Sequence, residues 1–178
     1  KGEVFHLVDE QYSAWHAGVS SWKNYEKINT WSVGIELVNP GHELGYRPFP
    51  KAQMDALTQL SLQIQERHQI SAHHVLGHAD VAPTRKRDPG ELLDWKALAA
   101  LGLGHHVEVS QISPCQTNIN YIQKLLKEIG YGIALTGKQD PQTLDALRAF
   151  CMRCAPAFLK QLTAPQVIAT LESYIEAL

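Results

Sequence analysis

Tryptophan and histidine are concentrated in the first part of this chain of 178 residues. All four Trp residues and seven of the nine His residues precede position 102, and neither type occurs from position 115 onward. Glycine and proline punctuate the segment between the two parts, which is typical of a linker. At about 150 residues per domain, the length permits two small domains. We therefore predict domains over residues 1–101 and 115–178, with a linker over residues 102–114.

Composition and charge exclude several classes of protein. Hydrophobic residues make up 44% and charged residues 19% of the chain, an ordinary globular mixture that argues against disorder. The 16 basic and 18 acidic residues give a net charge of -2, so nucleic acid is not expected as the main partner. No stretch approaches the roughly 18 apolar residues of a membrane span. No transmembrane segment is therefore expected in this chain.

The first part shows the patterns of an α/β domain. Apolar and polar residues alternate over residues 3–8 and 32–38, and a short strand pattern follows at residues 74–77. Apolar residues recur at helical spacing over residues 50–68, and residues 92–101 indicate a closing helix. This order predicts a mixed central sheet flanked by helices.

The second part shows the patterns of a small all-α domain with three helices. Thr117 is the expected cap of the first helix. Asp140, which is followed by proline, is the expected cap of the second helix. The third helix is expected over residues 163–178.

The three cysteines carry little information about function. Cys151 and Cys154 lie three positions apart on the predicted second helix, which by itself is a weak zinc signal. Buried thiols are the simpler interpretation. A disulfide from Cys115 to one of this pair is the alternative for an exported protein.

The segment over residues 77–90 concentrates groups that can perform chemistry. His78 and Asp88 lie ten positions apart, far enough for the chain to fold back and bring both to one point. An imidazole nitrogen and a carboxylate oxygen are two of the three protein ligands that a catalytic zinc site requires. Lys86 can donate to a developing oxyanion beside them. The alternative is a structural loop held by salt bridges.

Two sets of residues earlier in the chain each have a structural and a functional interpretation. Glu36 lies on the less apolar face of a predicted strand, where it is either a solvated carboxylate or, in a cleft, the general base for a metal-activated water. Trp15 and Trp31 are either core residues or the aromatic wall of a cleft that holds a sugar or peptide. His16 is then either a satisfied surface histidine or a polar contact in that cleft.

Three blocks of sequence carry a family resemblance. They are Ala-Trp-His-Ala-Gly at residues 14–18, Gly-Ile-Glu-Leu at 34–37, and Gly-His-Ala-Asp through Arg-Lys-Arg-Asp-Pro-Gly to Asp-Trp at 77–95. In this order and spacing they resemble the zinc-dependent N-acetylmuramoyl-L-alanine amidases of the AmpD/AmiD type, the amidase_2 family. The resemblance covers residues 1–101. The second part resembles a three-helix peptidoglycan-binding domain, so the layout is AmiD-like.

The resemblance implies an enzyme that cleaves the amide between N-acetylmuramic acid and the L-alanine of the stem peptide, with peptidoglycan and muropeptides as partners. His78 and Asp88 match zinc ligands. Glu36 matches the acid and base that activates the water, and Lys86 matches the cation that stabilises the oxyanion. His16, with Trp15 beside it, matches a substrate-binding position.

One family feature has no counterpart in this sequence. The family's first zinc ligand is a histidine on a strand that would lie upstream of Lys1. Three explanations are open: the strand lies outside the given sequence, it was removed by proteolysis, or this member lost the ligand and only binds peptidoglycan. We favour the first two, because a pure binding module has no chemical need of the four remaining groups.

The leading hypothesis is therefore a zinc amidase that degrades or recycles the cell wall. A non-catalytic peptidoglycan-recognition module that uses the same cleft is the alternative, and a purely structural metal loop is a third interpretation. The AmiD-like layout implies a periplasmic location, with a lipid anchor in the outer membrane carried by a segment upstream of Lys1.

Overall fold

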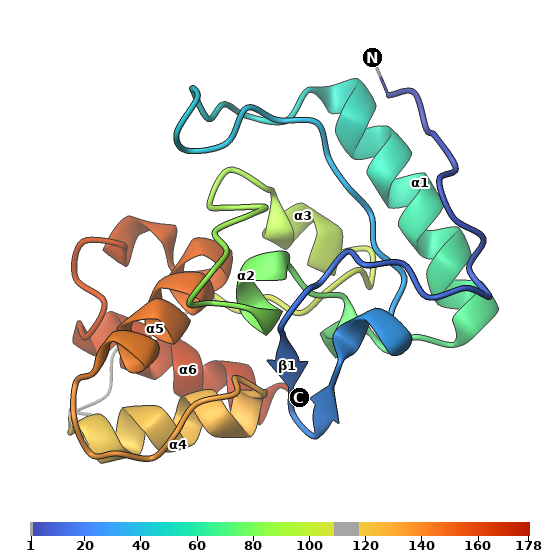
Figure 1. Ribbon diagram of the computed structural model, residues 1–178. Coiled ribbons are helices and arrows are strands. Elements are labelled where there is room, and N and C mark those ends of the chain that lie inside the picture. Colours follow the sequence, from blue (N-terminus) through green and yellow to red (C-terminus); the bar gives the residue numbers. More distant parts are fainter. Residues whose placement is uncertain (1, 109–117) are drawn as a thin grey trace.

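The structure is a computed structural model that describes residues 2–108 and 118–178, and these residues are mainly helical. Figure 1 shows α1 on one side of the molecule, α2 and α3 at the centre, and α4, α5 and α6 gathered on the other side. The described helices are α1 (Lys51–His68), α2 (His78–Val81), α3 (Trp95–Ala99), α4 (Ile119–Ile129), α5 (Pro141–Cys154), α6 (Pro165–Glu176), and the short 3-10 helices η1 (Ile28–Thr30), η2 (Ala72–His74) and η3 (Pro156–Phe158).

The predicted central sheet is wrong for the described residues. Their only strands are β1 (Ser21–Trp22) and β2 (Tyr25–Glu26), which form one antiparallel pair. Residues 32–38 alternate in sequence, but none of their backbone groups pairs with the backbone of another described segment. A strand needs such a neighbour, because its N–H and C=O groups point sideways out of the segment.

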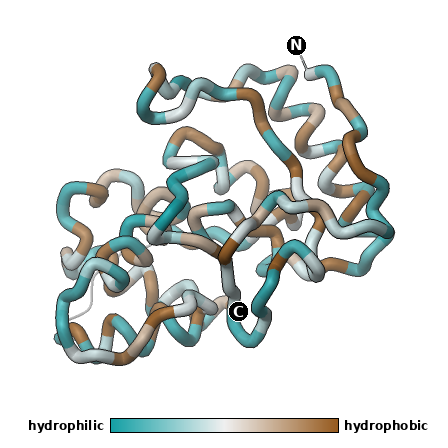
Figure 2. The backbone as a smooth tube through the Cα atoms, viewed as in Figure 1, coloured by the Kyte–Doolittle hydropathy of each residue, from teal (hydrophilic) through white to brown (hydrophobic). Residues whose placement is uncertain are grey.

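The same holds for the other two predicted strands. Residues 3–8 run past α1 without ladder hydrogen bonds to any described segment, and Figure 2 shows hydrophobic and hydrophilic stretches alternating along this part of the chain. Phe5 is 76% exposed on one face of this segment and Val4 is 58% exposed on the other, so neither face is covered. The third predicted strand, over residues 74–77, begins at the last residue of η2. Val75 and Gly77 have extended backbones, but they form no ladder hydrogen bonds with another described segment.

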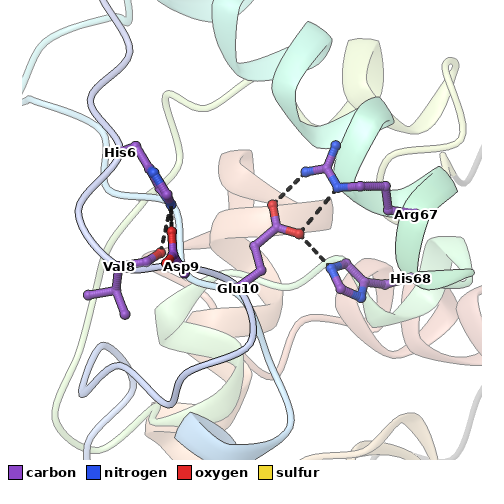
Figure 3. A network of polar contacts seen from close by, with 6 residues as sticks. All are labelled: His6, Val8, Asp9, Glu10, Arg67 and His68. Carbon is purple, nitrogen blue, oxygen red and sulfur yellow. Dashed lines mark hydrogen bonds and ion pairs between the residues drawn. The ribbon is translucent and has the colours of Figure 1, made fainter.

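A polar cluster fastens the N-terminal segment to the end of α1 (Figure 3). The Glu10 carboxylate accepts hydrogen bonds from Nε of Arg67 at 3.2 Å and from Nε2 of His68 at 2.6 Å. These bonds lower the pKa of the Glu10 carboxyl to about 2, with the bond from Arg67 as the largest cause. Arg67 and His68 also lie in the last helical turn, where positive charge suits the helix dipole.

The helix predictions are largely confirmed. α1 begins directly after Pro50, which is its N-cap, and ends at His68 as expected. Asp140 caps α5, where its side chain accepts a hydrogen bond from the backbone N–H of Thr143. The closing helix is shorter than predicted: it is α3, capped by Asp94. Thr117 lies outside the described residues, and the observed cap of α4 is Asn118, which accepts from the Tyr121 N–H.

The predicted separate three-helix domain is not evident. α4, α5 and α6 are present, but their core is continuous with residues of the first part, namely Trp22, Ala79, Val81 and Ala82. α2 also contacts α5 directly. A second, smaller core around Trp95 includes Leu103, which is 1% exposed, so the start of the predicted linker is packed. The two parts therefore share one interior.

Two further expectations concern the thiols and the membrane. Cys151 and Cys154 are buried free thiols, and burial raises the pKa of each to about 12, which fits the simpler interpretation. Cys115 lies outside the described residues. Among the helices over residues 2–108 and 118–178, none has the length and apolar character needed to span a bilayer.

Candidate active site

A cavity of about 680 Å³ lies between the central helices and the unpaired segment 32–38. Its volume falls within the range of about 300–1,000 Å³ that is usual for sites of small ligands. All six residues that the sequence singled out for chemistry or substrate binding line it: Trp15, His16, Glu36, His78, Lys86 and Asp88. The structure thus brings together residues from three separate blocks of sequence.

His78 and Asp88 are in direct contact across the turn of the loop. Nδ1 of His78 lies 3.0 Å from Oδ2 of Asp88. The backbone supports this contact, because the N–H of Ala79 donates to the carbonyl oxygen of Asp88 at 2.8 Å. The interaction with His78 is the main cause that lowers the pKa of the Asp88 carboxyl, and the nearby charge of Lys86 adds to it.

The second nitrogen of the His78 ring is also engaged. Nε2 lies 3.1 Å from the carbonyl oxygen of Ala17, which can only accept a hydrogen bond. The Asp88 carboxylate opposite Nδ1 likewise can only accept, so both ring nitrogens face acceptors. A hydrogen or a metal ion on Nδ1 therefore joins His78 to Asp88.

The donor types thus fit zinc, whereas the number of donors is short of a catalytic site. Zinc takes histidine nitrogen and carboxylate oxygen, and a catalytic site uses three protein ligands. Over residues 2–108 and 118–178, no group of three or more His, Cys, Asp or Glu side chains is placed to hold a metal ion. The described residues thus supply two donors of the kind that zinc takes, one fewer than a catalytic site uses.

Glu36 and Lys86 line the same cavity as this pair. Glu36 is exposed on the unpaired segment, so its carboxylate is open to the cavity and to water. Lys86 is partly buried and lies close enough to Asp88 to lower that group's pKa. A free carboxylate and an ammonium group that line one cavity can serve proton transfer and oxyanion stabilisation.

Trp15 and His16 form the outer part of the cavity. Trp15 is 93% exposed and Trp31 is 68% exposed, so the interpretation of these two residues as core is wrong. Nε2 of His16 lies 2.8 Å from Oγ of Ser32, whereas its Nδ1 is buried without a hydrogen-bond partner. A buried ring nitrogen beside an exposed aromatic side chain suits a ligand that has both polar and apolar faces.

Two residues of the site were not identified from the sequence. Arg85 donates through Nη2 to the carbonyl oxygens of Ala17 at 2.8 Å and Val19 at 2.6 Å, and so ties the Trp15 block to the loop. Tyr46 donates to the carbonyl oxygen of Pro89 at 2.7 Å and accepts from the N–H of Leu92 at 2.9 Å. Both contacts join segments distant in sequence, and no local pattern predicts them.

Comparison with known proteins identifies the family. The family described as N-acetylmuramoyl-L-alanine amidase (Amidase_2) matches residues 1–91, which is half of the chain. The chain belongs to this family.

Named relatives agree with this assignment. The chain is 40% identical over 118 residues to N-acetylmuramoyl-L-alanine amidase AmiD of Escherichia coli (strain K12), which covers 64% of this chain and 43% of the relative. It is 37% identical over 100 residues to 1,6-anhydro-N-acetylmuramyl-L-alanine amidase AmpD of Enterobacter cloacae, covering 56% of this chain and 51% of that protein. The chain thus spans about half the length of these relatives.

Solved structures extend the likeness over nearly the whole chain. A complex of AmiD from E. coli with the substrate anhydro-N-acetylmuramic acid-L-Ala-D-gamma-Glu-L-Lys has a TM-score of 0.85 at 31% identity, covering 98% of this chain and 73% of that one. AmpDh3 from Pseudomonas aeruginosa, in complex with anhydromuramic pentapeptide, has a TM-score of 0.83 at 30% identity, covering 97% and 72%. The likeness to these two structures therefore extends to α4, α5 and α6 as well.

Proposed function

We propose that this protein hydrolyses the amide bond between N-acetylmuramic acid and the L-alanine of the stem peptide. The observation that carries the proposal is the convergence of Glu36, His78, Lys86 and Asp88 on one cavity. Membership of the amidase family supports it, as does the likeness to structures that hold anhydromuropeptides. Peptidoglycan and its muropeptide fragments are the proposed partners.

Zinc is the proposed cofactor. His78 and Asp88 would hold it, and the third ligand would be a histidine upstream of Lys1. Bound zinc supplies Lewis acidity, which makes a water molecule a nucleophile at neutral pH and polarises a carbonyl. The 3.0 Å contact between Nδ1 of His78 and Oδ2 of Asp88 supports a cation at this position, because both atom types are zinc ligands.

The chain's own residues would divide the remaining work. Glu36 takes a proton from the attacking water and delivers it to the nitrogen of the leaving L-alanine. Lys86 donates a hydrogen bond to the oxygen of the scissile carbonyl as negative charge develops there. Trp15 offers an exposed aromatic face to the substrate, and His16 offers a polar contact beside it.

We further propose that residues 115–178 bind peptidoglycan and that the protein acts in the periplasm, anchored to the outer membrane by a lipid upstream of Lys1. Binding by this part would raise the local concentration of substrate at the catalytic residues. Its three helices are the feature that supports a binding role, although they pack against the first part.

The test of the activity is hydrolysis of anhydro-N-acetylmuramyl-tripeptide by the intact protein, followed by mass spectrometry of the released peptide. We expect a free L-alanine amino terminus in the product, and about a 10²–10⁴-fold loss of turnover in Glu36→Gln. Glu43→Gln is the matched control, because Glu43 is an exposed glutamate outside the cavity lining. Tight binding of the muropeptide by the wild-type protein without any cleavage would favour the recognition module instead.

A further inference from the structure

We infer that Arg153, on α5, is a positioning residue for His78 and Asp88, so that the C-terminal helices are part of the catalytic apparatus. The inference rests on the proposed function for the roles of His78 and Asp88. It assigns to α5 a task that a peptidoglycan-binding module does not have.

The Arg153 guanidinium is buried, and each of its three nitrogens donates a hydrogen bond. The residue is 4% exposed. Its Nη1 donates to Oδ2 of Asp80 at 2.8 Å, its Nη2 to the carbonyl oxygen of Val75 at 3.0 Å, and its Nε to that of His105 at 3.0 Å. Its Cζ lies 3.9 Å from the ring centroid of Trp95. Three acceptors and one aromatic face thus hold the group in a single orientation.

Two of these acceptors lie on either side of His78. Val75 precedes His78 by three positions, and Asp80 follows it by two. Asp80 is itself 4% exposed, and its carboxylate also accepts from the N–H of Gly77 at 2.8 Å and from the hydroxyl of Tyr131 at 2.9 Å. The backbone on both sides of His78 is therefore held in place by the Arg153 guanidinium and by its counter-ion, the Asp80 carboxylate.

The same pinned segment holds Asp88. The N–H of Ala79, next to His78, donates to the carbonyl oxygen of Asp88 at 2.8 Å. Gly77 packs against Pro89 so closely that a Cβ on Gly77 would lie 2.7 Å from Cδ of that proline. Any rotation of α2 would therefore move both candidate ligands relative to the cavity.

The chemistry of the pair favours positioning over simple stabilisation. A buried ion pair is weak evidence of stability, because the cost of removing two charges from water offsets their attraction. What the ion pair provides is a defined geometry, since a guanidinium donates and a carboxylate accepts hydrogen bonds in fixed directions. Lysine cannot reproduce three separate donations in one plane, so Arg153→Lys keeps the charge and removes the geometry.

The experiment compares Arg153→Lys with Arg148→Lys in the intact protein. Arg148 is the matched control, because it lies on the same helix and pairs with Asp145 of α5 itself. The first measurement is amide hydrogen exchange at Ala79, with Leu126 of α4 as the reference for global opening. The second is zinc affinity by competition with a chelator.

We expect Arg153→Lys to speed exchange at Ala79 while Leu126 is unchanged, and to weaken zinc binding by about 10-fold to 100-fold, as for other residues that orient metal ligands. Tyr131→Phe, which removes one bond to Asp80, should give a smaller change of the same kind. Arg148→Lys should change neither quantity.

Four results would overturn the inference: unchanged exchange at Ala79, an equal change at Leu126, unchanged zinc affinity despite faster exchange, or loss of the fold in Arg153→Lys. The last would assign Arg153 to global stability alone. Failure of the proposed function looks different: the wild-type protein would then bind no zinc, and exchange at Ala79 alone would decide the role of Arg153.

Discussion

Gly34 has no space for a side chain, because the ring of His16 lies against it. A Cβ built on Gly34 would be 2.5 Å from Cγ of His16. The glycine of the Gly-Ile-Glu-Leu block therefore has a physical task, which is to let His16 sit beside Glu36 in the cavity.

Gly34→Ala should displace the His16 ring and raise KM for the muropeptide more than it lowers kcat, since His16 is proposed to contact substrate. The double variant with His16→Ala should be no worse than His16→Ala alone, because both changes then act through the same ring. Steady-state kinetics of the three variants measure this. Additive losses would show that Gly34 acts elsewhere.

At the residue scale, the sequence singled out six residues that share a cavity, and their proposed roles stay predictions. Trp15, His16, Glu36, His78, Lys86 and Asp88 all reach one cavity. The contacts of Arg85, Tyr46 and Arg153 were not predicted, because each joins segments that only the tertiary fold brings together.

At the scale of elements, helices were easier to predict than strands for a physical reason. A helix satisfies its backbone within one segment, so apolar spacing and a cap suffice to indicate it, as for α1 and α5. A strand depends on a neighbour that its own sequence does not reveal. Alternation over residues 32–38 predicted a strand, but it could not indicate whether the segment is paired, and the segment lines the cavity without a backbone partner among the described residues.

The cap of α4 gives a prediction at this scale. The Asn118 side chain accepts from the N–H of Tyr121 at 2.9 Å. Asn118→Ala should lower the free energy of unfolding by about 1 kcal/mol, while Asn118→Asp should retain most of it because aspartate also caps well. Urea unfolding measures both. Equal losses in the two variants would mean that the side-chain oxygen is not what stabilises the helix.

At the scale of the whole molecule, the two parts defined by tryptophan and histidine content share one core. The residue composition changes along the chain, but this change does not show which surfaces are buried against each other. Ile122, Leu126 and Leu147 are 0% exposed in a cluster that includes Ala79 and Val81 of α2. Removal of α4 to α6 would expose α2 and leave Asp80 without Arg153.

A protein truncated after residue 108 should therefore lose the cooperative unfolding transition of the intact protein, together with its zinc binding. The reason is that a buried carboxylate without its partner is strongly destabilising. Calorimetry and zinc analysis check this. A truncated protein that melts cooperatively and binds zinc like the intact one would support a separable domain.

Four histidines near the contact between the two parts predict how stability depends on pH. Burial is the largest cause that lowers the pKa of His73, His74, His105 and His106 below the ordinary value of 6.5. The unfolded chain binds more protons than the folded protein just below that value, so stability rises with pH there. The contribution of these four histidines to stability is fully present above about pH 6.5, and it is lost as pH falls through the lowered pKa values.

Urea unfolding at pH 7.5 and 5.5 should thus show lower stability at the lower pH. The lowered carboxyl pKa values of Glu10, Asp88 and Asp140 do not act in this window, because those groups are ionised in both states. His105→Gln should reduce the difference. Equal stability at the two pH values would contradict the assigned burial of these rings.

In the proposed mechanism, His78 and Asp88 together hold a catalytic zinc ion. The decisive measurement is anomalous diffraction at the zinc edge, from crystals of the intact protein. We expect a peak at about 2 Å from both Nδ1 of His78 and a carboxylate oxygen of Asp88, with a third protein ligand completing the site. Zinc bound elsewhere, or no zinc peak in a protein that hydrolyses muropeptides, would contradict it.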